Sequence, residues 1–332
     1  MSVKQKHLWT FVAKLFPTAR STYVASPARV RFLRARVVFW TCAMMFTVGV
    51  GVYLRAEISR RVAHFSDRQS FQAARTGGTL LIVGGGQLPD MIRQQFVELA
   101  GGHRARIVVI PAAIVDPATL NQYRDSWLKY DVDSVDVLYA DSRGQADDPE
   151  FSRQLEHATG VWMGGGAQTF LAGYYGRTLV EQRLKELLAR NGVIGGTSAG
   201  AAIMSSVMIA GGRETPTLGR GFDLIPGAII DQHFVKRNRI RRLQKALADH
   251  PDLVGFGIDE GAALQFAVDS GRFRVIGQSC VIACVPKIES EQRISYQFEF
   301  FNPGDDFDIE RLRRGDAVPP SYVDLDSVLL GE

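Results

Sequence analysis

Residues 191–202, NGVIGGTSAGAA, contain one serine among glycines and alanines, directly after an apolar run. The stretch Gly196-Thr197-Ser198-Ala199-Gly200 fits G-x-S-x-G, the pattern of a nucleophilic serine on a sharp turn from a strand into a helix. Small neighbours let the strand and the helix pass closely, and the Ala199 amide would point at negative charge developing on a substrate. The same residues could also serve only close packing at a helix start. Ser198 is thus a candidate nucleophile.

A serine at neutral pH needs a general base. His233 directly follows an apolar strand in GAIIDQHF, although a histidine in such a place can also be purely structural. A carboxylate should fix the tautomer of the imidazole. Three acids lie between the serine and the histidine, and spacing alone does not choose among Glu214, Asp223 and Asp231.

The run Gly164-Gly165-Gly166-Ala167-Gln168 ends another expected strand. The amides of Gly165 and Gly166 could supply a second oxyanion donor, and Gln168 could reach a substrate amide or carboxylate. The alternative is a tight turn that starts a helix. TLLIVGGG (79–86) lacks the complete G-x-G-x-x-G pattern and its acidic ribose contact, and no metal-ligand spacing of cysteine and histidine occurs. No cofactor and no metal are expected.

A basic cluster follows the histidine: Lys236, Arg237, Arg239, Arg241 and Arg242. Such a run is usually a solvated helix face, and Ile240, Leu243 and Leu247 give this helix an apolar stripe. Arginines at its start would lie beside His233, and their forked guanidinium groups suit carboxylates. The cluster therefore predicts an acidic substrate.

The elements that must position these residues alternate along the chain. Apolar runs at 79–83, 106–113, 134–140, 160–166, 192–196 and 227–231 alternate with helical patterns, including 169–190 and 199–208. Continuous apolar strands between helices indicate a parallel sheet covered on both faces. We expect one α/β sandwich over 78–290, with ligands at the carboxyl ends of the strands. In the extension 291–332, SYQFEFF (295–301) could add an edge strand, and loop and tail should follow.

The charge is uneven. The net charge is +4, but residues 1–36 contain eight basic residues and no acid, so the remainder is negative and offers no nucleic-acid surface. Residues 37–54 are uncharged and just long enough to cross a bilayer as a helix, and a linker follows at 55–77. We expect an uncleaved membrane anchor with the larger part outside the cytoplasm, periplasmic or extracellular. A cleaved signal peptide, giving a secreted protein, is the alternative.

GGTSAGAAIMS, GGGAQ, DQHF and GFGIDEGAA resemble, in order and spacing, the motifs of the cyanophycinase and aspartyl dipeptidase family of serine peptidases, family S51. The likeness covers about residues 78–290. It implies a three-layer sandwich with a mostly parallel sheet, similar to class I glutamine amidotransferases. In the resemblance Ser198 is the nucleophile, His233 the base and Glu214, within GGRETPT, the acidic member of the triad.

The resemblance is closer to cyanophycinase than to the dipeptidases, because it also covers the expected substrate contacts: Gln168, Asp231, Gln232, Arg237, Arg239 and Arg242. It implies release of β-Asp-Arg from cyanophycin, a poly-aspartate with arginine on each side chain. An α-aspartyl dipeptidase or broad peptidase on the same triad, or a tethered protein that only binds acidic ligands, are the alternatives. A homodimer is compatible with the sequence. The leader, the apolar segment and the C-terminal extension depart from the family pattern.

Overall fold

The computed structural model describes residues 77–113, 116–290 and 293–316. In this part of the chain no helix is both long enough and apolar enough to span a bilayer. The expected basic leader, anchor and linker at 1–36, 37–54 and 55–77 lie almost entirely outside the described residues.

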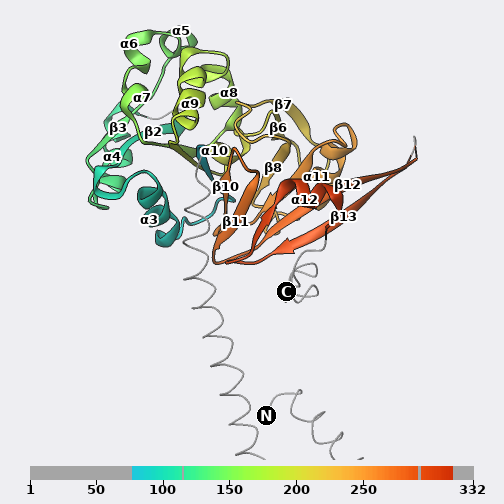
Figure 1. Cartoon of the computed structure of the whole chain (residues 1–332). Coiled ribbons are helices and arrows are strands. Elements are labelled where there is room, and N and C mark those ends of the chain that lie inside the picture. The colour runs from blue at the N-terminus through green and yellow to red at the C-terminus, as the bar shows by residue number, and fades with distance from the viewer. Residues whose placement is uncertain (1–76, 114–115, 291–292, 317–332) are drawn as a thin grey trace, which may run out of the picture. The chain divides into compact units, whose positions relative to one another are not determined.

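A mixed sheet of eight strands forms the centre of the α/β fold (Figure 1). Five neighbouring strands are parallel, namely β1 (Thr79–Val83), β5 (Val193–Thr197), β4 (Gly160–Gly166), β2 (Arg106–Ala112) and β3 (Ser134–Val137). Antiparallel strands extend it beyond β1, namely β10 (Ala262–Ala267), β11 (Arg272–Gly277) and β14 (Asp306–Asp308). The expected parallel sheet is therefore present, with a mixed edge.

Both faces of this sheet are covered, as the continuous apolar strands predict. In β1, Leu80 and Ile82 belong to one core, and Leu81 and Val83 belong to the other. The first core includes side chains of α8 (Gln168–Tyr175), α9 (Leu179–Ala189) and α10 (Ala199–Ala202), and of the short helices α5 (Arg143–Ala146) and α7 (Gln154–His157), with α6 (Pro149–Ser152) alongside. The second core includes α3 (Asp90–Leu99) and α4 (Leu120–Leu128).

A second sheet of four strands has the order β13 (Arg293–Phe301), β12 (Val281–Ser290), β9 (Val254–Ile258) and β8 (Ala228–Gln232). Its own core lies under α11 (Ile240–Ala248), where Leu243 and Leu247 are buried against Ile229 and Ile282. The expectation that 227–231 joins the main sheet is wrong, because β8 pairs with β9 instead. The edge strand expected at 295–301 is confirmed as part of β13.

The helix expected over 199–208 ends after one turn. The carbonyls of Ile203 and Met204 accept hydrogen bonds from the amides of Phe222 (2.7 Å) and Leu224 (2.8 Å), which replaces the helical pattern. The hairpin of β6 (Val207–Gly211) and β7 (Thr217–Arg220) then follows.

The segment after Asn302, expected as loop and tail, contains β14 and α12 (Ile309–Arg314). Phe307 is buried and pairs in register with Phe273 of β11. Asp308 accepts from the amides of Glu310 and Arg311 and so caps α12. This part of the extension is therefore integral to the fold.

Candidate active site

Ser198 lies between β5 and α10, at the carboxyl end of the parallel sheet. Its φ of 53° and ψ of −106° are sparsely populated for a residue with a side chain, a strain typical of functional turns. A Cβ on Gly196 would come within 2.3 Å of the Gly200 carbonyl oxygen, and one on Gly200 within 2.2 Å of that of Met163. The small neighbours are therefore required by the close crossing of the strand and the helix.

His233 directly follows β8 and places its ring against the serine. Its Nε2 lies 2.9 Å from Ser198 Oγ, a hydrogen-bond distance suited to proton transfer. The histidine is 7% exposed, and its φ of 48° is also in the left-handed region. The structure thus brings together the serine and the histidine that the sequence indicated.

The carboxylate on the other ring nitrogen is Glu260, whose Oε1 lies 2.6 Å from His233 Nδ1. Glu260 follows β9, the parallel neighbour of β8 in the second sheet. Glu214 is exposed in the connection between β6 and β7, so its assignment as the orienting acid is wrong in this structure. Asp223 is exposed as well, and Asp231 is bound elsewhere. The sequence signal for Glu260 was its place after an apolar strand, in GFGIDEGAA.

One backbone segment holds all three parts of this arrangement. The carbonyls of residues 83–85 accept, in order, the amides of Ser198 (3.0 Å), His233 (2.7 Å) and Gly261 (3.2 Å), the last beside Glu260. The end of β1 therefore fixes the relative positions of the nucleophile, the histidine and the acid.

The glycines of the same segment lie directly on the side chains of the site. A Cβ on Gly85 would lie 2.5 Å from Cε1 and Nε2 of His233, and one on Gly86 would lie 2.9 Å from Cβ and Oε2 of Glu260. Both glycines have positive φ, 103° and 73°. Glycine is therefore required at both positions, because the backbone approaches the side chains of His233 and Glu260 too closely for a Cβ.

The expected oxyanion donors differ in their positions. Ala199 is the first residue of α10, where the amide has no acceptor within its helix. Gly165 borders the serine, because a Cβ built on it would lie 3.7 Å from Ser198 Cβ. Gly166, with φ of 151°, packs against the Ala112 carbonyl at the end of β2. Ala199 and Gly165 therefore lie next to the serine, and their role as oxyanion donors stays a prediction.

Gln168 begins α8, and its side chain is engaged within the protein. Its Nε2 lies 3.0 Å from the carbonyl oxygens of both Ile209 and Ala210 in β6. The amide nitrogen therefore holds the hairpin against α8, and only the amide oxygen is left for a substrate.

Asp231 and Arg242, both expected to contact substrate, form a buried ion pair. Arg242 Nε lies 2.9 Å from Asp231 Oδ2, and its Nη2 donates to Oδ1. The third donor, Nη1, lies 2.7 Å from the Gly212 carbonyl. With side chains 0% and 3% exposed, neither residue has surface for a substrate in this structure. Burial raises the pKa of Asp231, and the positive charges of Arg242 and Arg239 oppose that shift.

The remaining expected substrate contacts are Gln232, Arg237 and Arg239, and two of them are engaged with each other. Arg239 Nη1 lies 2.6 Å from both the carbonyl and the side-chain oxygen of Gln232, and 3.5 Å from Asp231 Oδ1. Burial lowers the pKa of Arg239 to about 10. Gln232 is buried, whereas Arg237 is exposed. Of the three arginines Arg237, Arg239 and Arg242, only Arg237 is exposed.

The geometry allows a specific chemistry. The serine oxygen is hydrogen-bonded to a histidine, and the histidine is hydrogen-bonded to a carboxylate. This is the arrangement of an acyl-transfer site. The serine stands at a helix start beside a glycine turn, where amides can stabilise an oxyanion.

Comparisons with known proteins agree with this chemistry. The family model described as peptidase family S51 matches residues 80–274. A cyanophycinase of Synechococcus elongatus is 35% identical over 224 residues, which cover 63% of this chain and 69% of that protein. A cyanophycinase of Nostoc sp. (strain PCC 7120) is 36% identical over 230 residues, covering 65% and 75%.

Among solved structures, a peptidase from an acI-B1 Actinobacterium has a TM-score of 0.52 and 23% identity, covering 70% of this chain and 97% of that one. This likeness supports the fold. Because the family model matches more than half of the sequence, the chain belongs to peptidase family S51 and is a serine-type peptidase.

Proposed function

We propose that the chain hydrolyses aspartyl peptides of the cyanophycin type with a Ser198–His233–Glu260 triad. The observation that carries the proposal is the continuous hydrogen-bond path from Ser198 Oγ through His233 to Glu260, at 2.9 and 2.6 Å. The substrate class is supported by the names of the relatives that are 35–36% identical, all cyanophycinases.

In the proposed mechanism Ser198 Oγ attacks the scissile carbonyl while His233 Nε2 accepts the serine proton. Glu260 holds the Nδ1–H tautomer of His233 and stabilises the imidazolium. The amides of Ala199 and Gly165 bind the oxyanion. His233 then donates the proton to the leaving amine, and a water activated by the same ring hydrolyses the acyl-enzyme.

The test uses the full chain purified in detergent, with insoluble cyanophycin and a set of Asp-X dipeptides as substrates. We expect soluble β-Asp-Arg from the polymer and slower turnover of α-Asp dipeptides. Ser198→Ala should remove both hydrolysis and labelling by an active-site serine probe. Labelling of Ser198→Ala as strongly as the wild type would refute the triad, and preference for Asp-X dipeptides would favour the dipeptidase alternative.

We also propose that residues 37–54 anchor the enzyme in the membrane with the peptidase part outside the cytoplasm. The support is the uncharged run itself, preceded by eight basic residues. Protease is added to cells whose outer envelope is permeabilised but whose cytoplasmic membrane is intact, and it should degrade the peptidase part. Deletion of residues 1–54 should release the protein from the membrane fraction. Protection from protease would reverse the orientation, and recovery of the protein expressed without the deletion in the soluble fraction would indicate cleavage or no anchor.

A further inference from the structure

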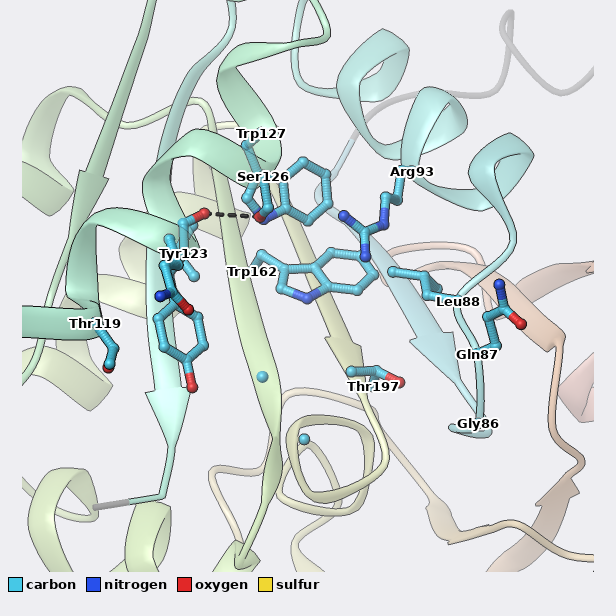
Figure 2. A pocket seen from close by; sticks show the side chains of 14 residues that line it. Gly86, Gln87, Leu88, Arg93, Thr119, Tyr123, Ser126, Trp127, Trp162 and Thr197 are labelled. Atoms are coloured by element: carbon cyan, nitrogen blue, oxygen red, sulfur yellow. Dashed lines mark hydrogen bonds between the residues drawn. The ribbon is translucent and has the colours of Figure 1, made fainter. Parts of the chain in front are cut away.

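A cleft of about 680 Å³ lies beside the serine (Figure 2). Fourteen described residues line it, and they include Thr197, the residue before Ser198, and Gly165, which borders the serine. A volume of this size is typical of sites that bind small molecules, and it suffices for a dipeptide-sized part of a substrate. Because the cleft adjoins the nucleophile, part of a peptide bound at Ser198 can enter it.

Arg93 is the one charged side chain among these lining residues. It projects from α3, and Figure 2 shows its guanidinium group directed toward the rings of Trp127 and Trp162. Its Cζ lies 5.6 Å from the centre of the Trp127 ring, a cation–π contact that fixes the group without neutralising it. The cleft therefore presents one positive charge and no carboxylate from its lining.

The nearby acid on α3 is engaged with other groups. Asp90 accepts a hydrogen bond from Gln94 Nε2 at 2.9 Å and one from the Tyr130 hydroxyl, and it lies 3.9 Å from Lys129 Nζ. Burial and the bond to Asp90 raise the pKa of Tyr130 to about 12, and Arg93 opposes the shift. The Tyr130 hydroxyl also forms a side-chain hydrogen bond with Arg93, but among the described residues no ion pair joins Arg93 to Asp90, so the positive charge of the guanidinium is not neutralised by this acid.

The other walls fit the remainder of a small acidic peptide. Trp127 and Trp162 form an apolar side, with ring centres 4.9 Å apart. Gln87, Gln122 and Thr119 add neutral polar groups. A carboxylate on Arg93 would form charge-assisted hydrogen bonds in a half-buried place, where they are stronger than at an open surface.

We propose that this cleft is a substrate subsite and that Arg93 determines specificity by binding a carboxylate of the peptide whose scissile carbonyl lies at Ser198. The proposal rests on the proposed function. It assigns acid recognition in this cleft to an arginine of α3, since Arg242 donates to Asp231 and Gly212, Arg239 donates to Gln232, and the exposed Arg237 does not line the cleft.

The kinetic test compares an aspartyl peptide with its asparaginyl counterpart, which has nearly the same shape but replaces the charged carboxylate with a neutral amide. For Arg93→Gln in the full chain we expect KM for the aspartyl peptide to rise about 10- to 100-fold, the effect of losing one charge-assisted contact, with kcat nearly unchanged. Turnover of the asparaginyl peptide should change less than about threefold. Arg93→Lys should restore part of the preference, because it keeps the charge without the fork.

The matched control is Arg124→Gln on α4, whose side chain is 51% exposed and which does not line the cleft. This variant should leave KM and kcat unchanged for both peptides. An unchanged KM for the aspartyl peptide in Arg93→Gln, or an equal loss for both peptides, overturns the assignment.

A binding experiment separates this proposal from the proposed function. Calorimetry with the Ser198→Ala chain measures affinity for the aspartyl peptide without hydrolysis, and Arg93→Gln in that background should weaken it about tenfold or more. If the wild type hydrolyses neither peptide but Arg93→Gln still weakens binding of the aspartyl peptide, the proposed function fails and the carboxylate-binding role of Arg93 is retained. If Ser198→Ala binds both peptides equally with and without Arg93, the subsite is refuted.

Discussion

The imidazole Nδ1 of His233 lies 2.6 Å from Glu260 Oε1, although 27 positions separate the two residues in the chain. The reason is the parallel pairing of β8 and β9, in which Gln232 is the partner of Ile258. His233 follows the first of these strands, and Glu260 follows the second after one further residue. Two neighbouring parallel strands thus bring the histidine and the carboxylate together at the same edge of the sheet.

Glu260→Gln should lower kcat about 10²- to 10⁴-fold while the fold is retained, because the amide cannot stabilise the imidazolium or fix its tautomer as a carboxylate does. Glu214→Gln is the matched control on an exposed acid and should retain wild-type turnover. Steady-state kinetics and circular dichroism of both variants provide the measurement. A large loss in Glu214→Gln with little effect in Glu260→Gln would restore the acid that the resemblance indicated.

Gly85→Ala should reduce kcat at least about 10²-fold, because its Cβ would lie 2.5 Å from the His233 ring and must displace the ring from the serine. Gly102→Ala is the control: its φ of 62° is also left-handed, but nothing lies within 4 Å of the added carbon. The control should lose only about 1 kcal/mol of stability and keep its activity. Equal activity of the two variants would contradict contact with His233 as the cause.

Arg242→Met should cost about 3–5 kcal/mol in the free energy of unfolding, since it leaves the Asp231 carboxylate buried without its main partner. Arg241→Met, on the exposed side of α11, should change that free energy by less than about 0.5 kcal/mol. Urea unfolding followed by circular dichroism measures both. If Arg242→Met is as stable as the wild type but has a raised KM, the arginine contacts substrate after all.

Glu181 joins α9 to β7 through Arg220, whose two guanidinium nitrogens lie 2.9 and 2.7 Å from its carboxylate oxygens. Burial alone would raise the pKa of Glu181, but the bonds from Arg220, the Arg177 amide and Lys185 lower it to about 2. A lowered folded-state pKa adds stability above the unfolded value of 4.5, and that stability is lost as the pH falls toward about 2.

The variant Glu181→Gln should therefore be less stable than the wild type by about 1–3 kcal/mol at pH 7, and this difference should shrink steadily between about pH 4.5 and pH 2. Urea unfolding at several pH values measures it. Glu98→Gln, at an exposed position of α3, should show a difference below about 0.5 kcal/mol throughout. A gap of constant size across this range would exclude the ion pairs as its origin.

The sequence predicted the features that depend on local pattern. Continuous apolar runs predicted the five parallel strands, and the glycines around Ser198 predicted the sharp turn from strand to helix, because close crossing leaves no space for a Cβ. The position of His233 at a strand end followed from the same kind of evidence. These features require only the chain near each residue.

The features that the sequence did not predict depend on how strands are shared between sheets. The sequence offers candidate acids between the serine and the histidine, whereas the pairing of β8 with β9 brings the Glu260 carboxylate from beyond the histidine. Arg239 and Arg242 point inward because Asp231 and Gln232, on the buried strand β8, need partners. Arg93 carried no signal in its own segment, since the cleft is formed by residues from α3, α4, β4 and β5.

The three successive carbonyls at residues 83–85 have a consequence for biosynthesis. They lie at and directly after the end of the first described strand, but their partners reach as far as Gly261. A nascent chain cannot complete the triad until the segment beyond β9 has left the ribosome and paired with this early one. Under the proposed function, the peptidase stays inactive until most of its length has been synthesised.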